Sequence, residues 1–218
     1  MLPQERYNKL IEYLQEHEII KIDQIVSLFD ISIETARRDL NHLEKEGIIK
    51  KIYGGATLMA PEAKEPATSD RLSRNLAEKT EIARKCADFI KDGDSILLEV
   101  GTTTLQVAKA LKEKRNLTVI TNSIHVVNEL MDTDFDIYVI GGKVRHGEGS
   151  VSGALTMFEL ENFQISKAII GGGGLTMERG LSDYNIEEAL VRKKVVEKAK
   201  EVILVVDHSK FGRDVLAH

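Results

Sequence analysis

The chain has 218 residues, of which 42% are hydrophobic and 30% are charged, and its formal net charge is −5. This length suits one large domain or two modest ones, and the apolar fraction argues against wholesale disorder. No apolar run reaches the ~18 residues of a membrane-spanning helix, and a secretory signal pattern is absent, so we expect a cytoplasmic protein with no membrane partner. The single cysteine, Cys86, excludes an intrachain disulfide and a multi-cysteine metal site.

Two prolines, Pro61 and Pro66, lie in a stretch of small and polar residues without apolar periodicity. Such a stretch is typical of a linker. We therefore predict an N-terminal domain over residues 1–58, a linker over 59–75 and a C-terminal domain over 76–218. Acidic residues outnumber basic ones on both sides of the linker, so any nucleic-acid argument depends on local placement.

The N-terminal part predicts three helices and a hairpin. Apolar residues Tyr7, Leu10, Ile11 and Leu14 have the spacing of an amphipathic helix. A second short helix fits residues 23–29, with Asp23 as its N-cap. After a tight connection, Ser32 has N-cap chemistry for a third helix, which ends before Gly47. Residues 48–58 then indicate two short strands around Gly54 and Gly55.

Helix, short turn and helix, followed by a basic hairpin, is the arrangement of a winged helix-turn-helix module. Thr35 and Arg38 are candidates for base contacts, whereas Arg37 is better placed for a phosphate or an ion pair. The alternative is a helical domain that docks a protein. The predicted DNA-binding residues are Ser32, Glu34, Thr35, Arg37 and Arg38 on the third helix, and Lys50, Lys51 and Tyr53 on the wing.

Residues 32–40, 43–47 and 53–56 resemble the DNA-binding domain of the DeoR family, bacterial repressors of sugar-metabolism operons. The Arg37-Arg38-Asp39-Leu40 run carries most of this resemblance. It implies double-stranded operator DNA as a partner.

From Ala77 onward, short β-branched runs alternate with helical stretches. This alternation predicts an α/β domain with a mostly parallel sheet covered by helices on both faces. The predicted helices cover 77–91, 105–113, 124–131 and 186–199. The predicted strands cover 95–100, 117–121, 136–140, 167–170 and 201–206.

Ligands of such sheets bind beyond the carboxyl ends of the strands. Four loops follow predicted strands: 101–104, 121–123, 141–143 and 171–174. Glycine, threonine hydroxyls and a helix start can cradle a phosphate, although simple helix capping or a flexible turn would explain each loop alone. The candidate effector-binding residues are Gly101, Thr102, Thr103, Thr104, Asn122, Ser123, Gly141, Gly142 and Lys210.

This half is similar to the DeoR-family sensor domain, which the resemblance relates in fold to sugar-phosphate isomerases. The matching segments include 92–94, 101–103, 121–123 and 207–212. The resemblance implies a phosphorylated sugar as effector, bound by Thr102, Thr103, Asn122, Ser123 and Lys210. Glu99 stands where the family usually has aspartate. Relatives are expected to continue beyond the equivalent of His218, so we expect a sensor domain truncated at its C-terminus.

Two functions follow as hypotheses. The first is a homo-oligomeric transcriptional repressor that a phosphosugar releases from its operator, with no enzymatic activity, cofactor or metal. The six histidines lack metal-ligand spacing. The second is a sugar-phosphate isomerase with an appended DNA-binding domain. Glu99, Asp183, Glu187 or Lys210 could serve that chemistry, but no convincing acid–base pair emerges from their spacing.

Overall fold

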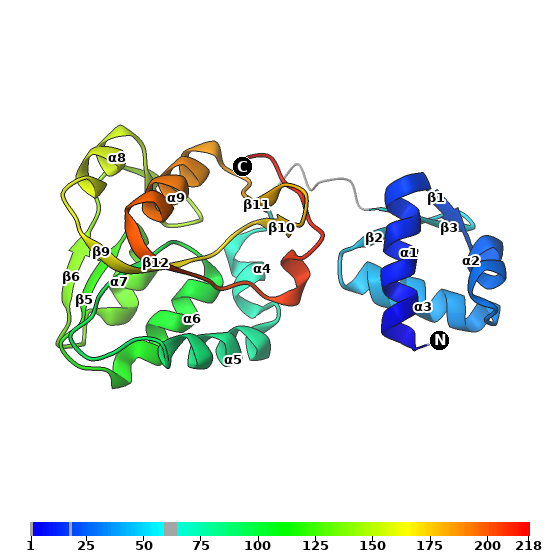
Figure 1. Ribbon diagram of the computed structural model, residues 1–218, viewed down its shortest axis with the longest axis horizontal. Coiled ribbons are helices and arrows are strands. Elements are labelled where there is room, and N and C mark those ends of the chain that lie inside the picture. The colour runs from blue at the N-terminus through cyan, green and yellow to red at the C-terminus, as the bar shows by residue number, and fades with distance from the viewer. Residues whose placement is uncertain (1, 18, 59–64) are drawn as a thin grey trace. The chain divides into compact units, whose positions relative to one another are not determined.

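A computed structural model of the chain describes residues 2–17, 19–58 and 65–218. The chain divides into two compact units, Met1–Glu62 and Ala63–His218, each with its own core (Figure 1). The predicted linker, 59–75, falls partly on residues 59–64, outside the described ones. Its second half contains a helix, α4 (Thr68–Ser73), which belongs to the C-terminal unit.

The N-terminal unit is a winged helix-turn-helix module. Its helices are α1 (Pro3–His17), α2 (Ile22–Phe29) and α3 (Ile33–Lys45). Its antiparallel sheet has the order β1-β3-β2, with β1 (Ile19–Lys21), β2 (Ile49–Ile52) and β3 (Gly55–Leu58). The core contains one to three buried apolar side chains from each helix, among them Leu10, Ile25 and Leu40.

Three details of this unit differ from the sequence prediction. Strand β1 was not predicted, because three residues carry too little periodicity. Helix α2 starts one residue early, and its N-cap is Lys21 rather than Asp23. The Lys21 amide donates to Gln24 Oε1 at 2.8 Å, which satisfies the helix start from within the first turn. Gly47 follows α3 with φ of +74°, as its predicted capping role requires.

The pairing of β3 with β1 requires glycine at position 55. A Cβ at this position would lie 2.1 Å from the carbonyl oxygen of Ile20 on β1. Glycine thus permits β3 to pair with both of its neighbours.

The C-terminal unit is an α/β domain built on a parallel sheet of order β12-β9-β4-β5-β6. These strands are β4 (Ser95–Leu98), β5 (Thr118–Thr121), β6 (Asp136–Val139), β9 (Ile165–Ile170) and β12 (Ala199–Leu204). The predicted fold class is therefore confirmed: the sheet is parallel and its helices lie on both faces.

Alternate residues of each strand point to opposite faces, which gives the unit two cores. Ile96 and Leu98 face α5 (Leu76–Ala87), α6 (Thr102–Ala110) and α7 (Ile124–Leu130), while Leu97 faces α8 (Ala154–Leu160) and α9 (Ile186–Lys198) (Figure 1). Two 3-10 turns, η1 (Leu111–Glu113) and η2 (His208–Lys210), follow α6 and β12.

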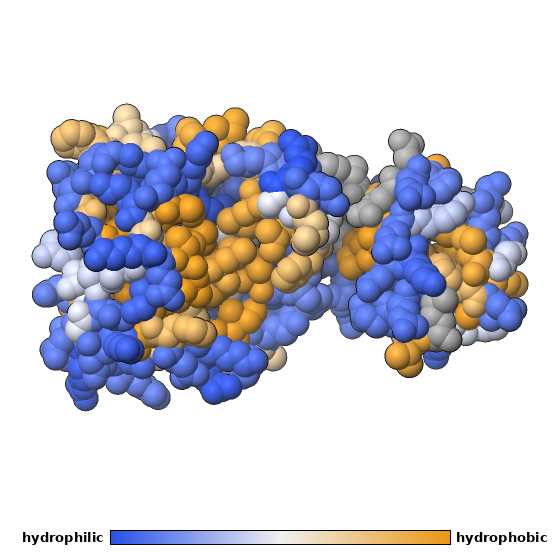
Figure 2. Space-filling model, in the orientation of Figure 1, coloured by the Kyte–Doolittle hydropathy of each residue, from blue (hydrophilic) through white to orange (hydrophobic). Residues whose placement is uncertain are grey.

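Two hairpins were not predicted: β7 (Lys143–Arg145) with β8 (Ser150–Ser152), and β10 (Gly174–Thr176) with β11 (Gly180–Ser182). Both lie after the carboxyl end of a sheet strand, where they add walls to that edge. Hydrophobic side chains gather over the edge strand β12 on the face shown in Figure 2. Within the described residues, no helix combines the length and apolarity needed to cross a membrane.

Candidate functional site

Helix α3 presents most of the predicted DNA-binding residues on its exposed side. The Ser32 hydroxyl accepts from the Thr35 amide at 3.2 Å, which makes Ser32 the N-cap. The two hydroxyls of Ser32 and Thr35 lie 3.0 Å apart. Glu34, Arg37 and Arg38 are exposed. The N-cap fixes where α3 begins, and the helix exposes the guanidinium groups of Arg37 and Arg38 to solvent.

The wing carries the other three predicted residues, Lys50, Lys51 and Tyr53, all exposed. Lys51 is tied back to α3, because its ammonium lies 2.7 Å from Glu44 Oε2 and 2.7 Å from Asn41 Oδ1. The same hydrogen bonding holds the pKa of Glu44 below its usual value. Lys51 thus braces the wing against the helix.

A buried ion pair fixes α3 against α1. Arg6 Nε and Nη2 donate to the two carboxylate oxygens of Asp39 at 2.8 and 3.1 Å. Both side chains are buried. Asp39 sits on the inner face of the Arg37-Arg38-Asp39 run, so burying it leaves the two arginines facing outward.

A pocket of the C-terminal unit lies beyond the carboxyl ends of β4, β9 and β12, at the start of α6. We call it the strand-end pocket; its cavity is about 40 Å³. Gly101 opens it with φ of +153°, and the Thr104 hydroxyl donates back to the Gly101 carbonyl at 2.9 Å. The predicted residues that line it are Gly101, Thr102, Thr103, Thr104 and Lys210, together with Gly171, Gly172 and Gly173 of the four-glycine loop.

A second hollow, the cationic pocket, shares Arg71, Thr102 and Lys210 with the first. Five cationic side chains line it around one carboxylate, Asp207: Arg71, Arg74, Lys79, Lys210 and Arg213. Burial lowers the pKa of Lys210 to about 8, and Asp207 only partly offsets the effect. Such an excess of positive charge favours an anion.

Part of the lining of the strand-end pocket is a carboxylate wall, which consists of Glu65, Glu148 and Glu188. Arg71 pairs with Glu148, and it lies 3.1 Å from Glu65 Oε1. Arg145 reaches Glu65 Oε2 at 2.6 Å and Glu188 Oε1 at 3.0 Å. This wall offers oxygens that can accept hydrogen bonds from sugar hydroxyls.

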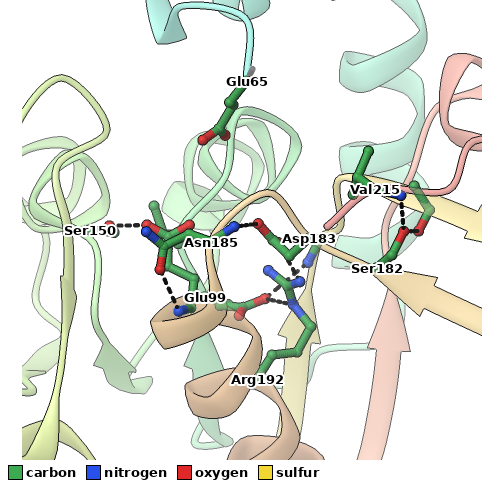
Figure 3. A network of polar contacts seen from close by, with 12 residues as sticks. Glu65, Glu99, Ser150, Ser182, Asp183, Asn185, Arg192 and Val215 are labelled. Carbon is green, nitrogen blue, oxygen red and sulfur yellow. Dashed lines mark hydrogen bonds and ion pairs between the residues drawn. The ribbon is translucent and has the colours of Figure 1, made fainter. Parts of the chain in front are cut away.

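Arg192 lines the strand-end pocket together with Asp183, and it links this acid to Glu99 (Figure 3). Its Nε lies 2.8 Å from Glu99 Oε2, and its Nη1 lies 2.5 Å from Asp183 Oδ2. Burial raises the pKa of Glu99 to about 7, against the opposing effect of Arg192. Glu99 does not line either pocket, so its place is under the site rather than in it.

Four predicted effector residues are not brought to the pocket. Asn122 is buried; it accepts from the Val100 amide at 3.1 Å and donates to the Val151 carbonyl at 3.2 Å. Ser123 caps α7. The Gly141 amide donates to Glu159 at 2.6 Å. At Gly142 a Cβ would lie 2.6 Å from the Ser152 carbonyl oxygen. These loops lie at the β5 and β6 side of the sheet. Their polar groups form hydrogen bonds with the neighbouring β7–β8 hairpin and with α8.

The sequence analysis missed five charged side chains of this site. Four line the pocket, and the fifth, Arg145, pairs with one of them, Glu65; the four are Glu65, Arg71, Glu148 and Arg192. Glu65 and Arg71 lay in the predicted linker, and the partners of Glu65 are 6 and 80 positions away in sequence. Local periodicity carries no signal for these pairings, because the partners lie in segments distant in sequence.

Comparison with known proteins identifies the family. The family model for the DeoR-like helix-turn-helix domain matches residues 6–62, and the model for the DeoR C-terminal sensor domain matches residues 74–218. The chain belongs to the DeoR family. The expected resemblance is thereby confirmed in both halves of the protein.

Two curated relatives of this DeoR-family protein cover most of its length. The uncharacterized HTH-type transcriptional regulator FruR of Bacillus subtilis (strain 168) is 32% identical over 97% of this chain and 84% of the relative. The glycerol-3-phosphate regulon repressor of Escherichia coli (strain K12) is 34% identical over 98% and 85%. A solved D-ribose-5-phosphate isomerase in complex with phospho-erythronic acid covers 62% of this chain and 54% of its own, at 20% identity and a TM-score of 0.46, too low to bear on activity.

Proposed function

We propose that this DeoR-family protein is a DNA-binding transcriptional repressor of a sugar-related regulon. The winged module with its two outward arginines supports DNA binding. The relative in Escherichia coli, a named regulon repressor, supports repression. We expect a protein that acts in the cytoplasm, where its operator is.

The effector is a phosphorylated sugar or polyol. The observation that carries this proposal is the pairing of a cationic pocket with a carboxylate wall across one site. Lys210, Arg71 and the start of α6 would hold the phosphate. Glu148 and Glu188 of the carboxylate wall would accept hydrogen bonds from the hydroxyls. Among the candidate effector residues, Gly101, Thr102, Thr103, Thr104 and Lys210 keep this role, and Asn122, Ser123, Gly141 and Gly142 support neighbouring loops.

The protein acts as a homo-oligomer, since operators with paired half-sites call for symmetric reading modules. Val202 and Leu204 on the edge strand β12 are each more than a third exposed, which supports a further contact there. Gel filtration with light scattering tests this proposal; a monomer at micromolar concentration contradicts it.

Operator binding is tested with labelled DNA from the region upstream of the protein's own gene, by fluorescence anisotropy. Phosphosugars, with glycerol 3-phosphate as the first probe, should release the DNA. The same mixtures are followed by NMR. Release without turnover supports a sensor, and conversion of a phosphosugar to an isomer supports the enzyme instead.

Arg38→Ala tests the assignment of the reading helix. If Arg38 contacts a guanine edge, its loss should cost about 1–3 kcal/mol, a 5- to 150-fold weaker complex. The control is Lys9→Ala, which removes an exposed cation from α1. Equal affinities of the two variants would contradict the placement of α3 in the major groove.

A further inference from the structure

Glu65 is an acid in the wall of a pocket proposed to bind anions. It is the first described residue after 59–64, the segment that follows the winged module. Its side chain is 9% exposed and lines the strand-end pocket. Both carboxylate oxygens are engaged, Oε1 by Arg71 and Oε2 by Arg145. Burial, together with Glu148, raises its pKa, while the arginines oppose the rise.

The strand-end pocket, which Glu65 lines, is narrow. A cavity of about 40 Å³ holds on the order of three waters. The lining from the sheet and from α6 is buried and is fixed by strand pairing and helix hydrogen bonds. Glu65 is held by Arg71 and Arg145. Helix α4 is held by the contacts of Arg71 and Thr68 to Glu148 and by Leu72, which packs on the core. Residues 65–67, before α4, have no regular secondary structure, so Glu65 has fewer backbone restraints than the lining from the sheet and α6.

The Arg71 side chain lines both pockets. It binds Glu65 in the strand-end pocket, and it also lines the cationic pocket with Lys210. Its Nε is buried and has no hydrogen-bond partner among the described residues. A phosphate beside Lys210 would supply an acceptor for this guanidinium and would repel the Glu65 carboxylate. An incoming anion and Glu65 therefore compete for one cation.

We propose that Glu65 is a tethered competitor of the effector: its carboxylate occupies the pocket in the effector-free protein, and effector binding expels it and loosens the residues that follow it, up to α4. This inference rests on the proposed effector site and adds its mode of regulation. The two states are exclusive, so effector affinity and retention of Glu65 are reciprocally linked.

The test is Glu65→Gln in the full chain, with inorganic phosphate as probe and calorimetry at constant pH as readout. Arg71 keeps Glu148 and Arg145 keeps Glu188, so the fold should persist. Thermal melting without phosphate checks this. We expect phosphate to bind about tenfold more tightly than to the wild type, because the competitor no longer carries charge. The control is Glu81→Gln, an equal charge change at an exposed position of α5. An affinity equal to that of the control overturns the proposal.

Hydrogen exchange of peptides covering residues 65–73 gives a second readout. Phosphate should speed exchange there in the wild type, while Glu65→Gln should exchange fast without phosphate. Slower exchange on phosphate addition would overturn the competitor role. Lys210→Ala tests the effector site separately from the competition by Glu65. Unchanged phosphate binding in this variant would contradict the effector site. Lost binding in Lys210→Ala, with Glu65→Gln like the wild type, would leave the site standing and reject only the competition.

Discussion

Lys210 illustrates how a single residue acquires its chemistry from burial. It follows β12 in the turn η2, and burial favours its neutral form. Nearby Arg213, Arg71 and Lys79 act in the same direction, while Asp207 opposes them. An ammonium held in this way gains a partner when a phosphate arrives, so binding and protonation of Lys210 are linked.

This linkage gives a pH dependence. The pKa of Lys210 is about 8, against 10.5 for a free lysine, so Lys210 loses its proton at a lower pH than an exposed lysine does. Affinity for a phosphate monoester should therefore fall between pH 7 and pH 9, by about tenfold for each unit above the pKa. The monoester itself stays dianionic there, with a second pKa of about 6. Calorimetry at several pH values measures the slope.

Lys210→Arg is the matched control, because arginine keeps its charge throughout this range. Its affinity should be nearly flat between pH 7 and pH 9. A wild-type slope that persists in Lys210→Arg would assign the titration to another group, and the role given to Lys210 would be wrong.

At the scale of elements, the position of α3 depends on a contact that is distant in sequence. Ser32 and Gly47 define the two ends of the helix locally. Its placement against α1 depends on Arg6 and Asp39, which are 33 residues apart and buried. Tyr7 also stacks on His42, with ring centroids 4.6 Å apart. Local capping makes the helix, and these cross-helix contacts orient it.

Asp39→Ala should destabilise the N-terminal unit by about 3–5 kcal/mol, because it removes the carboxylate from a buried guanidinium. Urea unfolding followed by circular dichroism should show one transition at lower denaturant. The second transition, from the C-terminal unit, should not move, because each unit has its own core. Glu34→Ala on the exposed side of α3 is the control and should stay within about 0.5 kcal/mol. Similar midpoints for the two variants would refute the structural role of the pair.

At the scale of the whole molecule, a protein of net charge −5 is proposed to bind a polyanion. The acidic average does not exclude this, because operator contacts depend on the local surface of α3 and the wing. Lys50 and Lys51 are adjacent in sequence, yet only one of them is engaged in an ion pair that would have to open before the lysine could contact DNA phosphate. Lys51 is paired with Glu44, whereas the structure gives no such ion pair for Lys50 among the described residues.

Salt dependence separates the two lysines. Operator affinity of the wild type should fall steeply with salt, because each neutralised phosphate releases counterions. Lys50→Ala should lower the slope of log affinity against log salt by about 1, while Lys51→Ala should lower it less. Anisotropy titrations at several salt concentrations give both slopes. The opposite ranking would mean that the Lys51–Glu44 pair opens on DNA.

The sequence alone determined the family, the two-part organisation into a winged helix-turn-helix and a parallel α/β unit, and the Gly101–Thr104 loop at a strand end. These features depend on short-range signals: apolar periodicity, capping residues and glycines next to strands. Short elements without such signals, such as β1 and α4, escaped prediction. Asn122 and Gly142 follow strands as Gly101 does, so local signals predict the same role for all three; in the structure the first two lie against Val151 and Ser152 of β8.

Only the tertiary structure decided which charges meet. Glu65 and Arg145 are 80 residues apart, and Glu99 and Arg192 are 93 apart. Nothing in local periodicity pairs them, because periodicity reports which face of an element is buried and not what buries it. The strand order 12-9-4-5-6 brings the ends of β4, β9 and β12 together and leaves those of β5 and β6 aside. Topology therefore separates loops that share the same local sequence signals.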